Sequence, residues 1–214
     1  ENTALAGLHQ LRDVSLHHRL LLGGRLDVPF KQRELDAFMA ESGKFKCLLE
    51  LLRSIQSRNE KVIVFCINKR LQAFLSVALS RYFGLPPIPV INGDTKAVSK
   101  KQGGTTRKGI IESFEAREGF NVIIMSPVAA GVGLTVVGAN NVIHLERHWN
   151  PAKEAQATDR VYRIGQTKDV NVYIPVLSHP ELLSFDANLH QLLSKKSLLR
   201  DAVVTPEQVL PTPE

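Results

Sequence analysis

The stretch KVIVFCI, residues 61–67, decides the fold class of this chain of 214 residues. Its apolar and β-branched side chains follow one another without polar alternation, which is typical of a strand buried on both faces. Comparable stretches recur at IPVIN (88–92), NVIIM (121–125), NVIHL (141–145) and VNVYIPV (170–176). Because strands of this kind belong to parallel sheets covered by helices, the sequence predicts an α/β fold with a mainly parallel central sheet.

Amphipathic segments alternate with these strands and are expected to form the covering helices. Residues 42–58 carry apolar side chains at helical spacing, and Ser42 is a suitable N-cap for them. Further helices are expected at residues 3–22, 69–83, 105–116 and 152–163. The alternation supplies the crossover connections that a parallel sheet requires.

The composition fits one globular domain of generous size, with 43% hydrophobic residues. The net charge of +6 and the pI of about 9.4 indicate a polyanionic partner only weakly, because many soluble proteins are mildly basic without binding nucleic acid. The two cysteines, Cys47 and Cys66, form no CxxC pair. We therefore expect no disulfide and a reducing compartment.

Membrane and metal sites are not expected from the sequence. No stretch reaches the uninterrupted apolar length of a membrane helix, and no secretory signal opens the chain. The adjacent His17 and His18 cannot face one metal ion from a helix, so we expect packing or solvated side chains there. Because the first residue is Glu1 rather than methionine, we expect a fragment or a processed product.

Three polar or glycine-rich stretches follow predicted strand ends, where ligands bind in parallel sheets. They are INGDT (91–95), SPVAAGVGLT (126–135) and QATDRVYRIGQ (156–166). Gly131 and Gly133 would let backbone N–H groups approach a phosphate, although glycines after a strand also make plain turns. The chain has no GxxxxGK[ST] stretch and therefore no P-loop of its own.

The third stretch places Gln156, Arg160 and Arg163 at helical spacing, so that one amide and two guanidinium groups share a helix face. Two arginines without a P-loop suit a supporting role in phosphoryl transfer, in which they stabilise charge on a γ-phosphate held by another domain. The alternative is a solvated face in which Asp159 and Glu154 are ion-pair partners.

The combined motifs break this tie. Residues 126–170, SPVAAGVGLTVVGANNVIHLERHWNPAKEAQATDRVYRIGQTKDV, resemble motifs V and VI of the SWI/SNF-type DNA translocases of helicase superfamily 2. The HWNP box and the QAxDRxxRIGQ signature are specific, and Gln166 stands where DEAD-box RNA helicases carry arginine. Upstream, SGKFKCLLELLRS with KVIVFCIN, INGDT with RKGIIESFE, and LHQLRDVSLHH resemble earlier parts of the same lobe.

The resemblance covers roughly residues 5–178 and implies a RecA-like three-layer sandwich. It divides the chain into a helical lead-in from a first lobe (1–41), a RecA-like helicase C-terminal lobe (42–178) and a helical extension with a Pro-rich, disordered tail (179–214). The implied function is the second motor lobe of an ATP-dependent translocase on double-stranded DNA. ATP and Mg²⁺ would be held mainly by the first lobe, and the isolated chain would be inactive.

The resemblance also implies roles for individual residues. Arg160 and Arg163 would be the catalytic arginine fingers, with Gln156, Asp159, Gly131 and Gly133 near the nucleotide. The DNA backbone would be contacted by Asn68, Gly93, Asp94, Thr95 and Ser126, and Trp149 would pack beneath this surface. Four residues depart from common family choices: Pro127, Ala130, Thr135 and Glu146. Of these, Pro127 puts the local phosphate contact in most doubt, since it lacks a hydroxyl and a backbone donor.

The segment SFDANLHQLLSKKSLLRDAVV (184–204) resembles a tail common in bacterial members. It favours a bacterial, cytoplasmic protein, with a phage-defence system as a candidate pathway; a eukaryotic source would imply the nucleus. We interpret Lys195, Lys196 and Arg200 as a solvated face rather than DNA contacts. The alternative function is a degenerate, non-catalytic lobe that binds DNA or protein.

Overall fold

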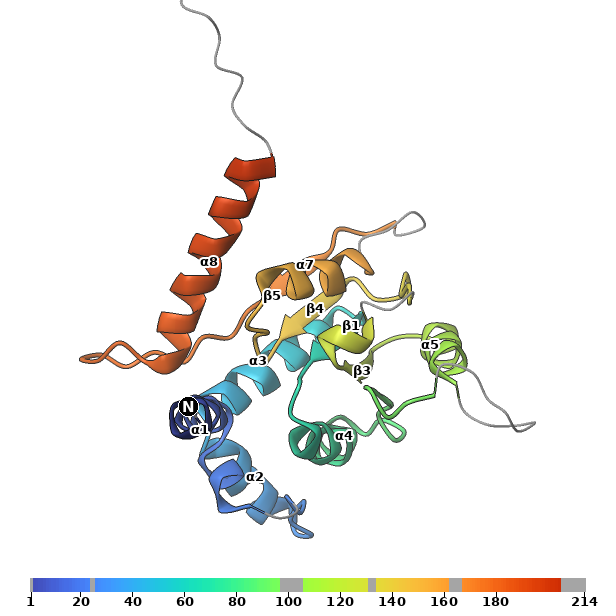
Figure 1. Ribbon diagram of the computed structural model, residues 1–214. Helices are drawn as coiled ribbons and strands as arrows, with labels where there is room; N and C mark the ends of the chain where they lie inside the picture. Colours follow the sequence, from blue (N-terminus) through green and yellow to red (C-terminus); the bar gives the residue numbers. More distant parts are fainter. Residues whose placement is uncertain (1, 24–25, 97–105, 131–133, 162–166, 205–214) are drawn as a thin grey trace, which may run out of the picture.

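The computed structural model describes residues 2–23, 26–96, 106–130, 134–161 and 167–204, and the predicted tail 205–214 lies outside them (Figure 1). Five strands form one sheet in the order β2-β3-β1-β4-β5. They are β1 (Lys61–Phe65), β2 (Val90–Ile91), β3 (Asn121–Met125), β4 (Asn141–His144) and β5 (Asn171–Tyr173). Each neighbouring pair is parallel, which confirms the predicted fold class.

The strands are shorter than the apolar runs that predict them. After Phe65 the N–H of Cys66 still donates to the carbonyl of Met125 at the end of β3, and β1 ends where the next N–H, of Ile67, donates to the carboxylate of Glu146 instead. β2 starts after Pro89, which has no N–H to give to a neighbouring strand.

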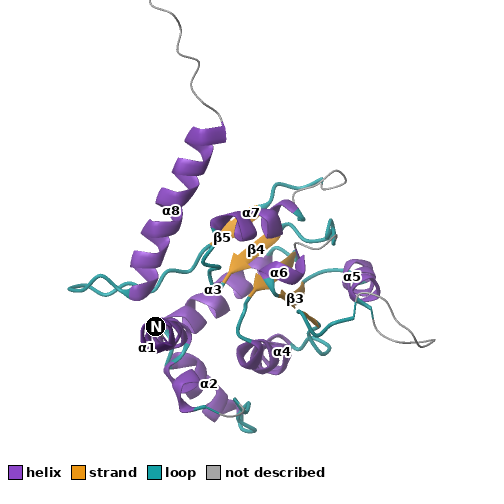
Figure 2. Ribbon diagram, in the orientation of Figure 1, coloured by secondary structure: helices purple, strands orange, loops and turns teal. Residues whose placement is uncertain are grey.

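The helices around the sheet are shown in Figure 2. They are α1 (Asn2–Leu16), α2 (Gln32–Ala40), α3 (Gly43–Ser57), α4 (Lys69–Phe83), α5 (Arg107–Ala116), α6 (Pro127–Ala130), α7 (Pro151–Asp159) and α8 (Phe185–Val204), with the 3-10 helix η1 (His18–Leu22). Alternation along β1 separates two cores: Val62 and Val64 pack against α1 to α4, and Ile63 and Phe65 pack against α5 to α7. Helices on both faces make the three-layer sandwich.

Several helix ends follow from local chemistry. Ser42 caps α3 by accepting a hydrogen bond from the N–H of Phe45, as expected, and Gly84 ends α4 with a left-handed φ of 60°. The expectation of one helix over residues 3–22 is wrong, because the structure has two helices there, α1 and η1. Helix α1 ends after Leu16, because the ring of His17 accepts from the N–H of Arg19 and starts η1.

The structure gives the bounds of two further helices, α2 and α8, towards the two ends of the chain. Helix α2 lies within the helical lead-in expected over residues 1–41, although no separate helix is predicted there, and it buries Leu35, Phe38 and Met39. Helix α8 packs its first half against α1 and α7 and then projects from the body of the domain (Figure 1). No helix in the described ranges is long and apolar enough to cross a membrane.

Candidate functional site

The carboxyl ends of the strands meet along one edge of the sheet, and the residues predicted to contact DNA follow three neighbouring strands there. Asn68 follows β1, Ser126 follows β3, and Gly93, Asp94 and Thr95 follow β2. These residues are half-buried or exposed. The structure therefore brings all five to the edge at which parallel sheets bind ligands.

Asn68 is the N-cap of α4. Its side-chain oxygen accepts from the N–H groups of Arg70 (3.0 Å) and Leu71 (3.2 Å), and its amide donates to Asp13 of α1 (3.1 Å). This side chain therefore fixes the loop at the end of β1 and ties it to the lead-in helix.

The turn after β2 is tied to the same loop. Lys69 and Asp94 form an ion pair with an Nζ–Oδ distance of 2.8 Å, and Gln72 accepts from the side-chain amide of Asn92 at 2.7 Å. The Arg107 guanidinium donates to the carbonyl of Thr95 at 2.8 Å. The turn after β2 is therefore held from both α4 and α5.

Pro127 creates no gap in the local backbone bonding. It is the first residue of α6, where a helix needs no N–H donor, and the carbonyl of Ser126 accepts from Ala130 at 3.0 Å. The N–H of Ser126 donates to the carbonyl of Ile91 at 2.8 Å. The departure at Pro127 thus fits the turn in which it lies.

The helix predicted to carry the arginines is α7. It begins after the cap residue Asn150 and ends at Asp159, and Arg160 is its C-cap in helical conformation. Gln156 and Asp159 are exposed and Arg160 is half-buried. The carbonyl of Arg160 accepts from the N–H of Val136 at 3.1 Å, which fixes this end of the helix against the strand connection.

Three predicted site residues lie outside the described residues: Arg163, Gly131 and Gly133. Among the described ones, Gln156 and Arg160 retain the four-residue spacing that places them on one face. The alternative was a solvated helix face on which Glu154 and Asp159 pair with the arginines. Glu154 does not take that part, because it is buried and its Oε1 lies 2.7 Å from Nε of Arg147.

Glu146 and Arg147 follow β4 after Leu145, and the sequence does not reveal the contacts that they make. Glu146 is 4% exposed, and one carboxylate oxygen accepts from the N–H groups of Ile67 and Asn68, both at 2.7 Å. Arg147 is 9% exposed and binds both carboxylate oxygens of Glu154. The available signal was two opposite charges at the end of an otherwise apolar strand.

His144 lies under α7 and stacks on Phe65 with ring centroids 5.0 Å apart. Its Nε2 is 2.9 Å from the hydroxyl of Thr158, and its Nδ1 is 3.8 Å from Glu154. Burial lowers the pKa of His144 to about 4, and nearby Arg147 acts in the same direction. The imidazole ring of His144 is therefore neutral beneath α7.

This neutral ring predicts a pH effect. In the unfolded chain a histidine has a pKa of about 6.5, so at pH 5 the unfolded state binds a proton that the folded state does not. The free energy of unfolding should fall by about 2 kcal/mol between pH 7 and pH 5 through this group. Glu154 opposes the effect, because burial raises its pKa.

Urea unfolding of the chain and of a His144→Gln variant at both pH values checks this expectation. The variant keeps the contribution of Glu154 and loses that of the histidine. Its free energy of unfolding should therefore fall by about 2 kcal/mol less than that of the unmodified chain. Parallel pH profiles of the two proteins would contradict the burial effect.

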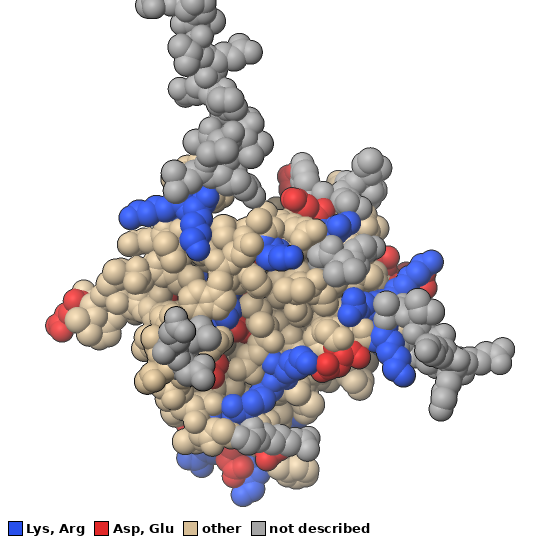
Figure 3. Space-filling model, in the orientation of Figure 1, with Lys and Arg blue, Asp and Glu red and all other residues tan. Residues whose placement is uncertain are grey.

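The charge on the edge is interleaved. Figure 3 shows separate groups of Lys and Arg side chains on the visible face, some of them beside acidic ones. Lys69 pairs with Asp94 and Lys108 with Glu112, both in exposed positions. The basic net charge thus gives no simple basic stripe among the described residues of this face.

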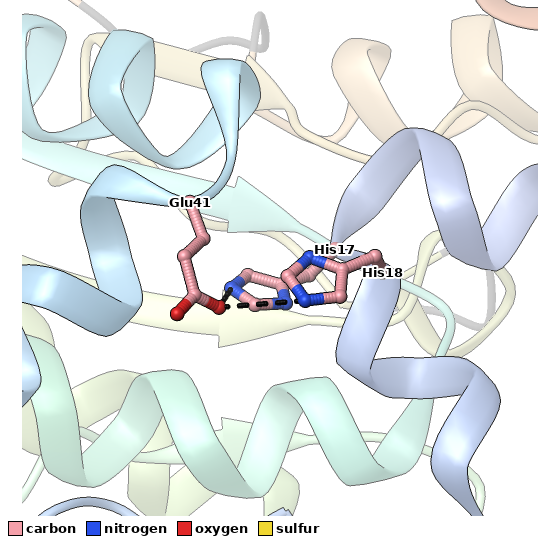
Figure 4. Close-up of side chains that lie close together, drawn as sticks. All are labelled: His17, His18 and Glu41. Carbon is pink, nitrogen blue, oxygen red and sulfur yellow. Dashed lines mark ion pairs between the residues drawn. The ribbon is translucent and has the colours of Figure 1, made fainter.

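His17, His18 and Glu41 converge at the junction of η1 and α2 (Figure 4). Both ring nitrogens of His17 are engaged, since Nδ1 accepts from Arg19 and Nε2 lies 2.9 Å from the carbonyl of Phe38. Glu41 binds the guanidinium of Arg19. The ligand atoms of His17, His18 and Glu41 lie within 4.8 Å of one another, so the expectation that the two histidines cannot face one metal ion is wrong in its geometry. The printed contacts of His17 and Glu41 make this a packed junction between helices.

Comparison with known proteins identifies the class. Residues 43–165 match the family model described as helicase conserved C-terminal domain. The Zorya protein ZorD of Escherichia coli O139:H28 is 45% identical over 173 residues, which are 79% of this chain and 16% of that protein. The putative ATP-dependent helicase/translocase YwqA of Bacillus subtilis is 31% identical over 203 residues, which are 95% of this chain and 20% of that protein.

Among solved structures, the SWI2/SNF2 ATPase core of Sulfolobus solfataricus in complex with dsDNA matches with a TM-score of 0.66 and 29% identity. The match covers 95% of this chain and 38% of that one. The chain belongs to the helicase conserved C-terminal domain family. Within it, the chain is a RecA-like lobe of the SWI/SNF type, which confirms the resemblance, and it spans a fifth or less of the two curated relatives.

Proposed function

We propose that the chain is the second motor lobe of an ATP-dependent translocase on double-stranded DNA. The observation that carries the proposal is the placement of α7. This helix begins after the carboxyl end of β4, and Arg160 closes it with a carbonyl bond to Val136 that fixes this end of the helix. Arg160, together with Arg163, would reach the γ-phosphate of ATP held by a preceding lobe and stabilise its transferring charge.

Three described carboxylates in or beside the candidate site favour a location of ATP and Mg²⁺ mainly on the other lobe. Asp94 pairs with Lys69, Glu146 with Arg12, and Glu154 with Arg147. Each is engaged with a cation of this chain, whereas Mg²⁺ needs carboxylate or phosphate oxygens that can enter its coordination shell. Bound ATP would supply the energy for the movement of the two lobes, and this lobe would contribute arginines and the track for the DNA backbone.

The DNA track is supported by the polar groups at the strand ends. Asn68, Gly93, Asp94, Thr95 and Ser126 offer short side chains and backbone groups of the kind that contact phosphates without reading sequence. The similarity to a SWI2/SNF2 core solved with dsDNA favours duplex DNA as the ligand. The similarity to ZorD, together with the bacterial type of α8, favours a bacterial phage-defence system as the pathway and the bacterial cytoplasm as the location.

A paired ATPase measurement tests the function. The longer protein, in which this lobe follows a P-loop lobe, should hydrolyse ATP with stimulation by duplex DNA, and its P-loop lysine variant is the control. The isolated chain of 214 residues should show no turnover above buffer, because it has no P-loop. Turnover by the isolated chain would contradict the two-lobe proposal. DNA binding by the longer protein without any hydrolysis would favour a degenerate binding module.

A further inference from the structure

Two adjacent side chains after β4 contact the loop that follows β1 and the helix α7. Glu146 and Arg147 both lie in the buried interior beside the candidate site. Glu146 contacts the loop after β1, and Arg147 contacts α7 and α8.

Glu146 holds the loop that carries Asn68. One carboxylate oxygen accepts two backbone hydrogen bonds of 2.7 Å, from Ile67 and Asn68. The other oxygen lies 2.9 Å from Nε of Arg12, in an ion pair that is not aligned as a hydrogen bond. Arg12 in turn lies over the ring of Trp149, 5.1 Å from its centroid. Hydrogen bonds to a buried carboxylate are roughly twice as strong as neutral ones, so this contact fixes the loop firmly.

Arg147 holds the helix that carries Arg160. Its Nε donates to both carboxylate oxygens of Glu154, at 2.7 and 3.0 Å, three residues into α7. One of its terminal nitrogens lies 2.7 Å from Nδ1 of His190 on α8. Since a guanidinium has no lone pair to accept with, the histidine nitrogen is the acceptor. Arg147 is therefore the bridge between α8 and the arginine helix.

We propose that Glu146 and Arg147 are positioning residues that couple DNA contact to nucleotide contact in this lobe. Glu146 sets the DNA-facing loop and Arg147 sets the arginine helix. Because the two residues share one peptide bond, a displacement of the loop by DNA is passed through this segment to α7. The inference rests on the proposed function and adds to it the residues through which the two ligands communicate.

Loss of the effect of DNA on hydrolysis tests the coupling in the longer protein. Glu146→Gln keeps the shape and removes the charge, so the DNA concentration for half-maximal stimulation of the ATPase should rise about tenfold. The ratio of the rates with and without saturating DNA should also fall about tenfold, because the loop no longer acts on α7. Arg147→Lys keeps the charge and loses the two-point contact with Glu154. It should lower the same ratio about tenfold or more, with the half-maximal DNA concentration unchanged.

Control variants separate this coupling from a general loss of folding. Lys153→Ala changes an exposed position of α7 beside Glu154, and it should leave both parameters unchanged. Asp13→Ala and His190→Ala remove only the outer partners, and they should shift the same two parameters in the same way with smaller effects. They provide the test if Glu146→Gln or Arg147→Lys unfolds in circular dichroism.

The outcomes distinguish the inference from the function beneath it. If either folded variant leaves the ratio of the rates with and without DNA unchanged, the coupling role is overturned while the motor function stands. If the unmodified longer protein shows no DNA-stimulated hydrolysis, the proposed function falls and the inference falls with it.

Discussion

Replacement of Arg160 with alanine in the longer protein should lower DNA-stimulated ATP hydrolysis by about 10³-fold or more. An arginine that stabilises charge on the γ-phosphate acts in the transition state, so kcat should fall while the affinity for ATP changes little. Arg160 is a half-buried C-cap, and its contact with Val136 uses only the backbone, so the variant keeps that contact.

Steady-state ATPase rates at saturating DNA measure this loss, and nucleotide affinity is measured separately by equilibrium binding. Arg160→Lys is the matched variant, because lysine retains the charge without the planar fork of the guanidinium, and it should recover little activity. Lys153→Ala on the same helix serves as the neutral control. A folded Arg160→Ala protein with a rate within tenfold of the unmodified one would exclude the arginine-finger role.

Replacement of Asp186 with alanine should lower the free energy of unfolding of the chain by about 3–5 kcal/mol. Lys44 is 3% exposed, and its Nζ lies 2.8 Å from Asp186. The change leaves a buried charge with only the carbonyl of Leu145 as a described partner, at 3.2 Å. It also removes the acceptor for the N–H of Leu177. Urea unfolding at pH 7 provides the measurement.

The pH dependence of that loss identifies its cause. Burial lowers the pKa of Lys44, and Asp186 opposes this shift, so the variant should have a still lower lysine pKa. The unfolded state then binds more protons than the folded state at alkaline pH, and stability should rise with pH. The deficit of Asp186→Ala should therefore shrink between pH 7 and pH 9.5. A deficit that stays constant would assign the loss to packing instead.

A double replacement provides the matched control. Lys44→Met with Asp186→Leu removes both charges, so it should recover most of the stability that Asp186→Ala loses. Recovery should be incomplete, because the backbone groups of Leu145 and Leu177 lose their side-chain partners. A double variant as unstable as Asp186→Ala would show that the unpaired charge is not the main cost.

The sheet could be predicted because β1, β3 and β4 are buried on both faces and leave a continuous apolar record in the sequence. The expectation of burial is wrong for β5, whose residues are exposed or half-buried. Helix ends were predicted where one local cap decides them, as at Ser42 and Gly84. The break at His17 could not be predicted, because an imidazole ring acts there as a cap and propensity does not describe that bond. The missed helix α2 did leave a signal in the spacing of its buried residues.

The candidate site divides in the same way. The position of Arg160 follows from spacing within one helix, and the strand ends place Asn68 and Ser126 on one edge. The parts played by Glu146 and Arg147 depend on partners far along the chain. Arg12 donates to the carbonyl of Arg147 across 135 positions, and Asn68 donates to Glu146 across 78. A single sequence contains no record of such pairs until the fold is known.

The chain contains one tryptophan, Trp149, which is half-buried between the lead-in and the C-terminal helix. Its ring lies under Arg12 and meets Phe185 edge-on, with centroids 5.8 Å apart. A guanidinium and an aromatic neighbour both affect indole emission. The intrinsic fluorescence of Trp149 should therefore report, without any label, whether α1 and α8 stay packed against this part of the lobe.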